Sequence, residues 1–402
     1  MAEPQQLTMN SSEDFRRNEN GWQNSVIIIP ALLSGCTLII VAIILWKSIR
    51  RKRDKRKGSK DKTGNQYLDG EWAVNAAGVY ENSLDTPDPI LEKRQLPGDW
   101  TVEQQLFVCN GHFGSISWAV LCRSGKTEDR QQVVLKELSE HCSPGEVQDF
   151  MDLMKFYVEV CNHDSLVKML WCQRKPPRLI MKAMSYGNLL TFLRNSHEGI
   201  QPAAETASRI TERDVYSMAS QVADGLEYLS LTHGLIHGYV AACNVVLHED
   251  LSVQLCGLGL AAIQYRTRSI PAQRAAQVPM KWLSPERLTR ADITEKSDVW
   301  SFGILLYEMI TLGSPPYPDL EPSQMPSKRQ KNYRMERPAL CGPLLFEIMT
   351  NCWQWEAPLR PCFTDVMKQL QKASAQADGQ TPLTAADTLS WKEYLHVAGI
   401  AS

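Results

Sequence analysis

A series of short motifs follows one fixed order along this chain, and that order constrains the fold more than any other feature. The series opens with a glycine-rich run and a strand-like run that ends in lysine. Two loops centred on histidine and on glycine come next, followed by apolar runs that contain tryptophan. Agreement over so many ordered motifs does not arise by chance. The motifs occupy residues 109–116, 133–136, 237–244, 257–259, 278–286, 297–303 and 360–361.

The series resembles the motifs of the protein-kinase family, continuously from about residue 100 to residue 371. The runs Val278–Glu286 and Ser297–Gly303 resemble those of tyrosine kinases in particular. Ala241-Ala242 also resembles the tyrosine-specific catalytic loop, in which Cys243 here replaces the usual arginine. The resemblance implies a two-lobed, kinase-like α+β fold, ATP and Mg²⁺ as cofactors, and transfer of the γ-phosphate to protein tyrosine.

Two aspartates that the kinase mechanism requires are missing. One accepts the proton of the substrate hydroxyl and the other holds Mg²⁺, but Tyr239 and Gly257 stand in their positions, beside an altered Gly238. A phenol with a pKa of about 10 accepts protons poorly at pH 7. The resemblance leaves Asn244 and His237 as the catalytic candidates. It places the metal site at Asn244 and at the Gly257 position, where the missing carboxylate weakens Mg²⁺ binding. We therefore expect a phosphotransfer rate at least about 10⁴ below that of an ordinary kinase.

The predicted nucleotide site is also altered. Cys109 replaces the first glycine of the glycine-rich loop, where a side chain crowds the approach of backbone to phosphate. Val134 replaces a small alanine that packs on adenine, which narrows the pocket. Lys136 is the candidate partner of the α- and β-phosphates. The resemblance assigns nucleotide binding to Val108, Gly111, Gly114, Ile116, Val134, Lys136 and Met181.

The acidic partner that kinases provide for this lysine is not evident. Family spacing places it near Leu153 or Met154, on the apolar stripe of a predicted helix. Asp152 and Glu159 are the nearest acids, and both are expected on other faces of that helix. Lys136 would then lack its usual ion pair, unless a shift of register brings in Asp152.

The positions that support the fold in kinases are retained. The resemblance implies that Glu286 pairs with Arg360 and that Asp298 binds backbone amides below the catalytic loop. Thr211 with Asp214 predicts a helix N-terminus. Trp300–Leu312, apolar on almost every side, predicts a buried helix.

An uncharged run near the N-terminus is long enough to cross a bilayer, and basic residues follow it. It predicts a single-pass plasma-membrane protein with its N-terminus outside and the kinase-like domain in the cytoplasm. The 11 cysteines show no metal-binding or disulfide pattern. The predicted segments are an extracellular segment 1–25, a transmembrane helix 26–46, a basic juxtamembrane segment and linker 47–98, a tyrosine-kinase-like domain 99–372 (N-lobe 99–184, C-lobe 185–372) and a tail 373–402.

Three functional hypotheses remain open. The first is a pseudokinase that signals by binding other signalling proteins or kinases, and the second is a weakly active tyrosine kinase. The third, compatible with the first, is an adaptor whose tyrosines are phosphorylated by other kinases, with Tyr67, Tyr80 and Tyr265 as candidates. Residues 47–60 are expected to bind anionic lipid. Homo- or hetero-oligomers are left open, and no nucleic-acid partner is expected.

Overall fold

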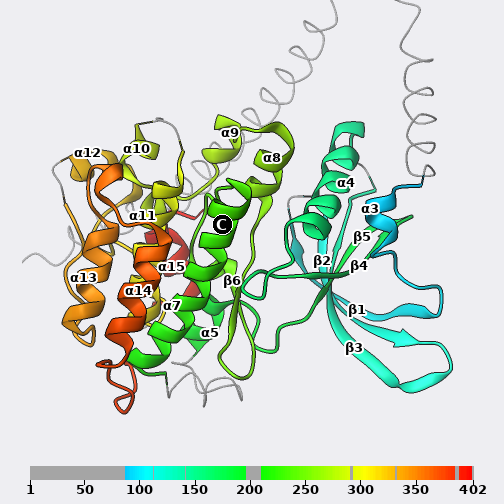
Figure 1. Ribbon diagram of the computed structural model, residues 1–402, viewed down its shortest axis with the longest axis horizontal. Helices are drawn as coiled ribbons and strands as arrows, with labels where there is room; N and C mark the ends of the chain where they lie inside the picture. The colour runs from blue at the N-terminus through cyan, green and yellow to red at the C-terminus, as the bar shows by residue number, and fades with distance from the viewer. Residues whose placement is uncertain are drawn as a thin grey trace, which may run out of the picture. The chain divides into compact units, whose positions relative to one another are not determined.

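The computed structural model describes residues 87–111, 113–140, 142–195, 210–289, 293–330, 333–384 and 389–400. These residues belong to one compact unit, Val79–Ser402. Figure 1 shows a lobe built on a β-sheet beside a lobe built mainly of helices. The predicted kinase-like α+β fold is confirmed.

The N-lobe contains a five-stranded antiparallel sheet in the order β1-β2-β3-β5-β4. One face carries a small apolar cluster that includes Leu121, Leu135 and Ile180. Alternate residues of β3 point to the other face, as the pleat of a strand requires. The strands are β1 (Trp100–Asn110), β2 (Ser115–Arg123), β3 (Lys126–Glu137), β4 (Met169–Arg174) and β5 (Pro177–Lys182).

Helix α4 (Pro144–Glu159) accompanies this sheet and begins at a capping box formed by Ser143 and Glu146. Its predicted apolar stripe is buried: Leu153 is 9% exposed, and Met154 is fully buried. The short helix α3 (Pro89–Glu92) precedes β1.

The C-lobe is organised around two helices. Helix α7 (Glu212–Glu227) begins at the predicted cap, where Thr211 and Asp214 exchange hydrogen bonds. Helix α11 (Glu295–Ile310) is buried along nearly its whole length, as its apolar sequence predicts. The other α-helices are α5 (Leu189–Asn195), α8 (Gly259–Thr267), α9 (Ala272–Ala275), α10 (Pro285–Leu288), α12 (Met325–Gln330), α13 (Pro343–Cys352), α14 (Phe363–Ser374) and α15 (Trp391–Ala398).

Short elements between these helices position the candidate site. The hairpin β6 (Val245–Leu247) and β7 (Val253–Leu255) separates the catalytic loop from Gly257. A π-helix, η1 (Tyr228–Thr232), extends α7, and four 3₁₀ turns complete the lobe. These turns are η2 (Ala242–Asn244), η3 (Met280–Trp282), η4 (Pro322–Gln324) and η5 (Ala357–Leu359).

The predicted localisation is contradicted. No helix among the described residues is long and apolar enough to cross a bilayer. The longest α-helices there have 16 residues, or about 24 Å, against a hydrocarbon core of about 30 Å. Outside the described residues lie the predicted segments 1–25 and 26–46, the lipid-binding stretch 47–60, and Tyr67 and Tyr80.

Candidate active site

The β-sheet gathers several of the predicted nucleotide-binding side chains on one face. Strand pairing sets Ile116 opposite Lys136, and Val134 opposite Met181. Lys136 and Val134 are two residues apart on β3, so both point to the same face. Val108 lies on the edge strand β1 with 47% of its surface exposed.

The glycine-rich loop is folded back against the end of β3. The N–H of Gly111 donates to the carbonyl of Gly114 (2.7 Å), and the N–H of Ser139 donates to the carbonyl of Phe113 (2.9 Å). Gly114 has a φ of +151°, and a Cβ there would overlap neighbouring backbone. The Phe113 ring packs edge-on against Phe150 of α4 at 5.5 Å between centroids. The loop therefore places an aromatic ring against the helix.

Lys136 forms no ion pair with any residue that the structure describes. Its charge acts on two thiols instead. Burial raises the pKa of Cys256 to about 11, and the positive charge of Lys136 lowers it in part. The same two effects act on Cys161, whose pKa is raised well above its ordinary value. The charge of Lys136 therefore acts on thiols, and no described carboxylate forms an ion pair with it.

The acidic residues of α4 are occupied by helix α8. The guanidinium of Arg266 binds Asp149 at 2.5 Å and Asp152 at 3.3 Å. The hydroxyl of Tyr265, a predicted phosphosite, donates to Glu159 at 3.2 Å. These bonds hold α8 against α4, so neither Asp152 nor Glu159 pairs with Lys136.

A side chain of α11 binds the backbone of the catalytic loop. Asp298 accepts the N–H groups of His237 (2.7 Å) and Gly238 (2.8 Å). Burial raises the pKa of Asp298 to about 6, although these bonds and the charge of Arg287 oppose the rise. Burial lowers the pKa of His237 to about 4, and its ring bonds the carbonyl of Cys256 at 2.8 Å. His237 is therefore a neutral core residue at pH 7.

The Tyr239 side chain is directed into the C-lobe. Its ring meets Trp282 edge-on at 6.2 Å, and its hydroxyl accepts from the thiol of Cys243 at 3.6 Å. Burial raises the pKa of Tyr239 far above its ordinary value. A phenol in this environment stays protonated, so it cannot replace the aspartate that accepts a proton in kinases.

The predicted metal site is closed by its own residues. The amide Nδ2 of Asn244 donates to the carbonyl of Tyr239 at 2.9 Å. Gly257 has a φ of +77°, and a Cβ there would overlap Oδ1 of Asn244. Within the described ranges, no group of His, Cys, Asp and Glu could hold a metal ion. These residues do not fit Mg²⁺.

Leu260 of α8 fills the space beside the catalytic loop. Gly238 has a φ of +80°, and a Cβ there would lie 2.7 Å from Cδ1 of Leu260. Leu260 also lines an interlobe cavity of about 330 Å³, together with Leu153, Ile263 and Tyr239. Charged and polar side chains line the same cavity, among them Asp152, Arg266 and Arg274.

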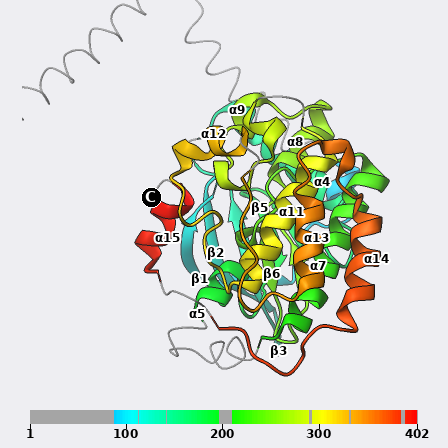
Figure 2. The ribbon, with the colours of Figure 1, turned by 90° about the vertical axis from the view of Figure 1, so that its left-hand side faces the viewer.

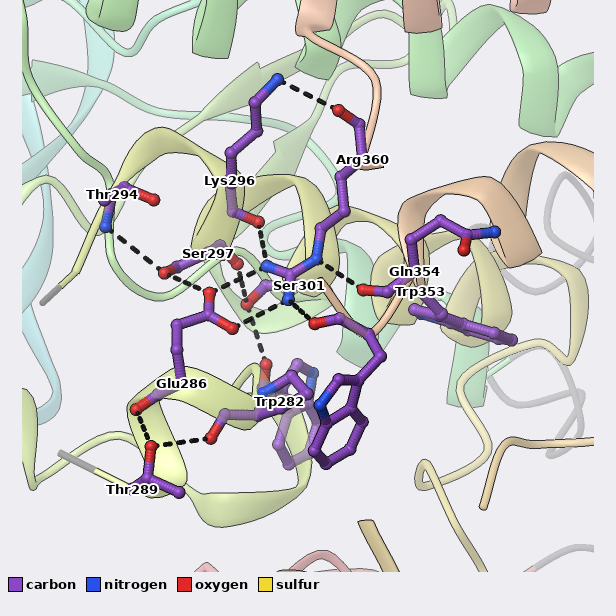
Figure 3. A network of polar contacts seen from close by, with 12 residues as sticks. Trp282, Glu286, Thr289, Thr294, Lys296, Ser297, Ser301, Trp353, Gln354 and Arg360 are labelled. Carbon is purple, nitrogen blue, oxygen red and sulfur yellow. Dashed lines mark hydrogen bonds and ion pairs between the residues drawn. The ribbon is translucent and has the colours of Figure 1, made fainter. Parts of the chain in front are cut away.

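A network below the site fixes the C-lobe (Figure 3). The guanidinium of Arg360 binds both oxygens of Glu286 at 2.8 Å. It also donates to the carbonyl of Lys296 at 2.7 Å, and Ser297 donates to Glu286 at 2.9 Å. Arg360 is almost fully buried. The pair that the family resemblance implies is therefore present as a buried ion pair.

Glu308 of α11 is a buried acid that the sequence did not mark as part of the site. One oxygen, Oε2, accepts from the N–H of Ala242 and from Nε1 of Trp282, both at 3.0 Å. The other oxygen has no hydrogen-bond partner among the described residues. Burial raises the pKa of Glu308 to about 7, and the two hydrogen bonds oppose the rise.

Glu308→Gln is expected to change the pH dependence of stability. As pH rises from about 4.5 to about 7, the folded state keeps a proton on Glu308 that the unfolded state has lost, so stability falls by about 3 kcal/mol. Glutamine preserves both accepted bonds and removes this fall. His237 acts in the opposite sense in both proteins, because its pKa is lowered. Urea unfolding at pH 5 and pH 8 measures the difference, and equal pH dependence in the two proteins would contradict the assignment.

Sequence reasoning did not anticipate Arg266, Leu260 or Tyr394 at this site. Arg266 and Leu260 belong to a segment without a strong periodic pattern. Tyr394 belongs to α15 and is fully buried, although the sequence shows only a weakly amphipathic tail there. The spacing of Tyr394 and Ala398, four residues apart, was the available signal.

The comparisons with known proteins agree with this architecture. The family model of protein tyrosine and serine/threonine kinases matches residues 102–370. The chain is 34% identical to tyrosine-protein kinase STYK1 of mouse, over 94% of this chain and 91% of the relative. It is also 34% identical to the human protein of that name, over 94% and 92%.

A further relative is tyrosine-protein kinase Abl of Drosophila melanogaster, with 35% identity over 65% of this chain and 15% of the relative. That match covers about two thirds of this chain, whereas the STYK1 matches cover nearly the whole of it. The ordered motifs, the two-lobed fold and these matches agree, and the chain belongs to the protein tyrosine and serine/threonine kinase family.

Proposed function

We propose that this chain is a tyrosine-kinase-like pseudokinase that acts by binding other signalling proteins or kinases. One observation carries the proposal: Asn244 is bonded to the carbonyl of Tyr239 and occupies the space next to Gly257. ATP and Mg²⁺ binding are general properties of the kinase family. In this chain Gly257 provides no carboxylate for the metal, and Asn244 occupies the space that a side chain at Gly257 would need.

The position of α8 supports the same conclusion. Arg266 and Tyr265 bind the acids of α4, so the helix that should supply a partner for Lys136 is held by α8 instead. Leu260 packs against the catalytic loop at Gly238. An α8 docked against α4 favours a stable binding surface over an open substrate channel.

Phosphotransfer is the direct test. Full-length protein with ATP, Mg²⁺ and a tyrosine-containing polymer is expected to transfer phosphate at least about 10⁴ times more slowly than an ordinary kinase. The rate should equal that of Lys136→Met, measured with γ-labelled ATP under the same conditions. Mg²⁺-dependent transfer that Lys136→Met abolishes would refute the proposal.

A weakly active tyrosine kinase is the second candidate, and the sheet face favours it. Lys136, Val134 and Met181 share the side that a nucleotide would contact, where Lys136 would hold phosphate and Val134 the adenine. Thermal unfolding with ATP distinguishes the two candidates. If ATP stabilises the protein only when Mg²⁺ is present, the result supports the kinase. If ATP stabilises the protein equally with and without Mg²⁺, or does not stabilise it at all, the result supports the pseudokinase.

A further inference from the structure

The C-terminal segment follows the C-lobe through specific backbone contacts. The N–H of Arg213 donates to the carbonyl of Asp378 (3.0 Å), and the N–H of Leu383 donates to the carbonyl of Ile210 (2.7 Å). Beyond these contacts, helix α15 starts at a capping box of Ser390 and Glu393. Figure 2 shows α15 in red at the edge of the helical lobe. Local signals therefore form this helix, and the chain at Asp378 and Leu383, between α14 and α15, is bonded to the start of α7.

Tyr394 and Ala398 form the buried side of α15, with no exposed surface. The guanidinium of Arg194, at the end of α5, lies 4.5 Å from the ring centre of Tyr394 and 4.8 Å from that of Trp391. Arg194 also donates to the carbonyl of Leu389. A cation between two aromatic rings stabilises such a contact, the more so when it is shielded from water.

The far end of α15 is seated as well. Gly399 closes the helix with a φ of +72°, and a Cβ there would lie 2.5 Å from Cγ of Pro322. Only glycine permits this conformation and this approach together. Helix α15 thus bridges α5 and η4, elements that lie far apart in the sequence.

The Tyr394 side chain is fully buried in the core of the C-lobe. It belongs to the same apolar cluster as Tyr239 and Cys243. Burial raises the pKa of Tyr394 above its ordinary value, and the charges of Glu308 and Cys243 add to the rise. The hydroxyl of Tyr394 and Oε1 of Glu308 are both buried without a hydrogen-bond partner in the described ranges.

The resemblance to tyrosine kinases implies a smaller side chain at one position of the catalytic loop in this protein. Their catalytic loop carries an arginine at the position of Cys243, and a thiol is much smaller than a guanidinium group. Glu308 is buried, and no ion pair joins it to a cation in the part of the chain that the structure describes. A tyrosine side chain combines an apolar ring with a hydroxyl group, so it suits a buried site that contains a carboxyl group.

We propose that helix α15 is a built-in ligand of a slot, which Cys243, Glu308, Tyr239 and Arg194 line, and that Tyr394 is its anchor. The slot accepts a short amphipathic helix bearing a buried tyrosine. In this protein the occupant is the chain's own C-terminal helix. Docking of α15 therefore covers one side of the catalytic loop, independently of whether the domain transfers phosphate.

Trypsin cleavage after Lys392 tests the docking in the full-length protein. Lys392 is exposed, but cleavage within a docked helix requires local opening. Tyr394→Ala is expected to speed this cut by about tenfold or more, because it removes the anchor and a cation–π partner. Arg194→Ala should act in the same direction without touching α15. His396→Ala, on the exposed side of the same helix, should leave the rate within about twofold.

A peptide of residues 389–400 tests the slot directly. Labelled peptide is expected to bind full-length Tyr394→Ala at least about tenfold more tightly than the natural protein, whose slot is filled. The same peptide carrying Tyr394→Ala should not bind. Equal cleavage rates in the natural protein and Tyr394→Ala, or equal binding of the two peptides, would overturn the proposal.

Discussion

Replacing Arg360 by alanine is expected to lower the free energy of unfolding by about 3–5 kcal/mol. The guanidinium binds Glu286, the carbonyls of Lys296 and Gln354, and the face of Trp300. Its removal leaves the Glu286 carboxylate buried without its cation, which costs more than the ion pair contributes. Urea unfolding of the full-length protein measures the change.

The pH dependence identifies the cause of this loss. Burial alone would raise the pKa of Glu286, but hydrogen bonds and charge from Arg360 lower it from 4.5 to about 2. A lowered carboxyl pKa contributes stability above pH 4.5, and this contribution disappears as pH falls toward 2. Arg360→Ala should therefore lack most of this acid-dependent loss.

Arg123→Ala is the matched control. Arg123 forms an ion pair with Asp99 at 2.7 Å, but both side chains are about 40% exposed. Solvent screens such a pair, so the expected loss is much smaller than that of Arg360→Ala. Comparable losses for Arg123→Ala and Arg360→Ala would contradict the assigned role of the buried network.

Returning the missing metal-binding aspartate by Gly257→Asp is expected to destabilise the protein without creating a magnesium site. The left-handed backbone at Gly257 costs a non-glycine residue about 1–2 kcal/mol. Overlap with Asn244 adds about 1–3 kcal/mol, because either the amide or the backbone must move. The variant should show no Mg²⁺-dependent rise in its melting temperature.

Gly125→Asp separates the two costs. Gly125 has a φ of +79°, nearly that of Gly257, but a Cβ there would meet nothing within 4 Å. Gly125→Asp should therefore lose only the stability that the left-handed backbone costs, whereas Gly257→Asp should also lose the stability that the overlap with Asn244 costs. Adding Asn244→Ala to Gly257→Asp should recover the excess. Equal losses at the two glycines, or Mg²⁺-dependent stabilisation of Gly257→Asp, would show that the closed site had been misassigned.

Much of the fold could be predicted from the sequence because its signals are local. The cap at Thr211 and the apolar stripe of α4 are set by residues within a few turns of one another. The ordered motifs identified the family for a similar reason, since each is a short run with its own backbone requirement. No comparable local signal existed for α8, whose helix is secured mainly by Arg266 and Tyr265 across the two lobes.

The candidate site divides in the same way. The sequence shows directly that Tyr239 and Gly257 replace the two aspartates, but it does not show the direction of the Tyr239 ring. That direction depends on Trp282 and Cys243, which pack the ring below the loop. The orientation of the Asn244 amide likewise depends on a carbonyl five residues away in the folded turn.

By itself, the sequence determined the kinase-like scaffold and the loss of two acidic groups, because both are properties of short segments and of residue identity. Tertiary structure alone decided that side-chain packing fills the places of the missing groups: Asn244 lies against Gly257, and Leu260 lies against Gly238. Each of these contacts joins different structural elements. These contacts depend on side-chain volume and burial in the folded chain, so no periodic pattern in the sequence predicts them.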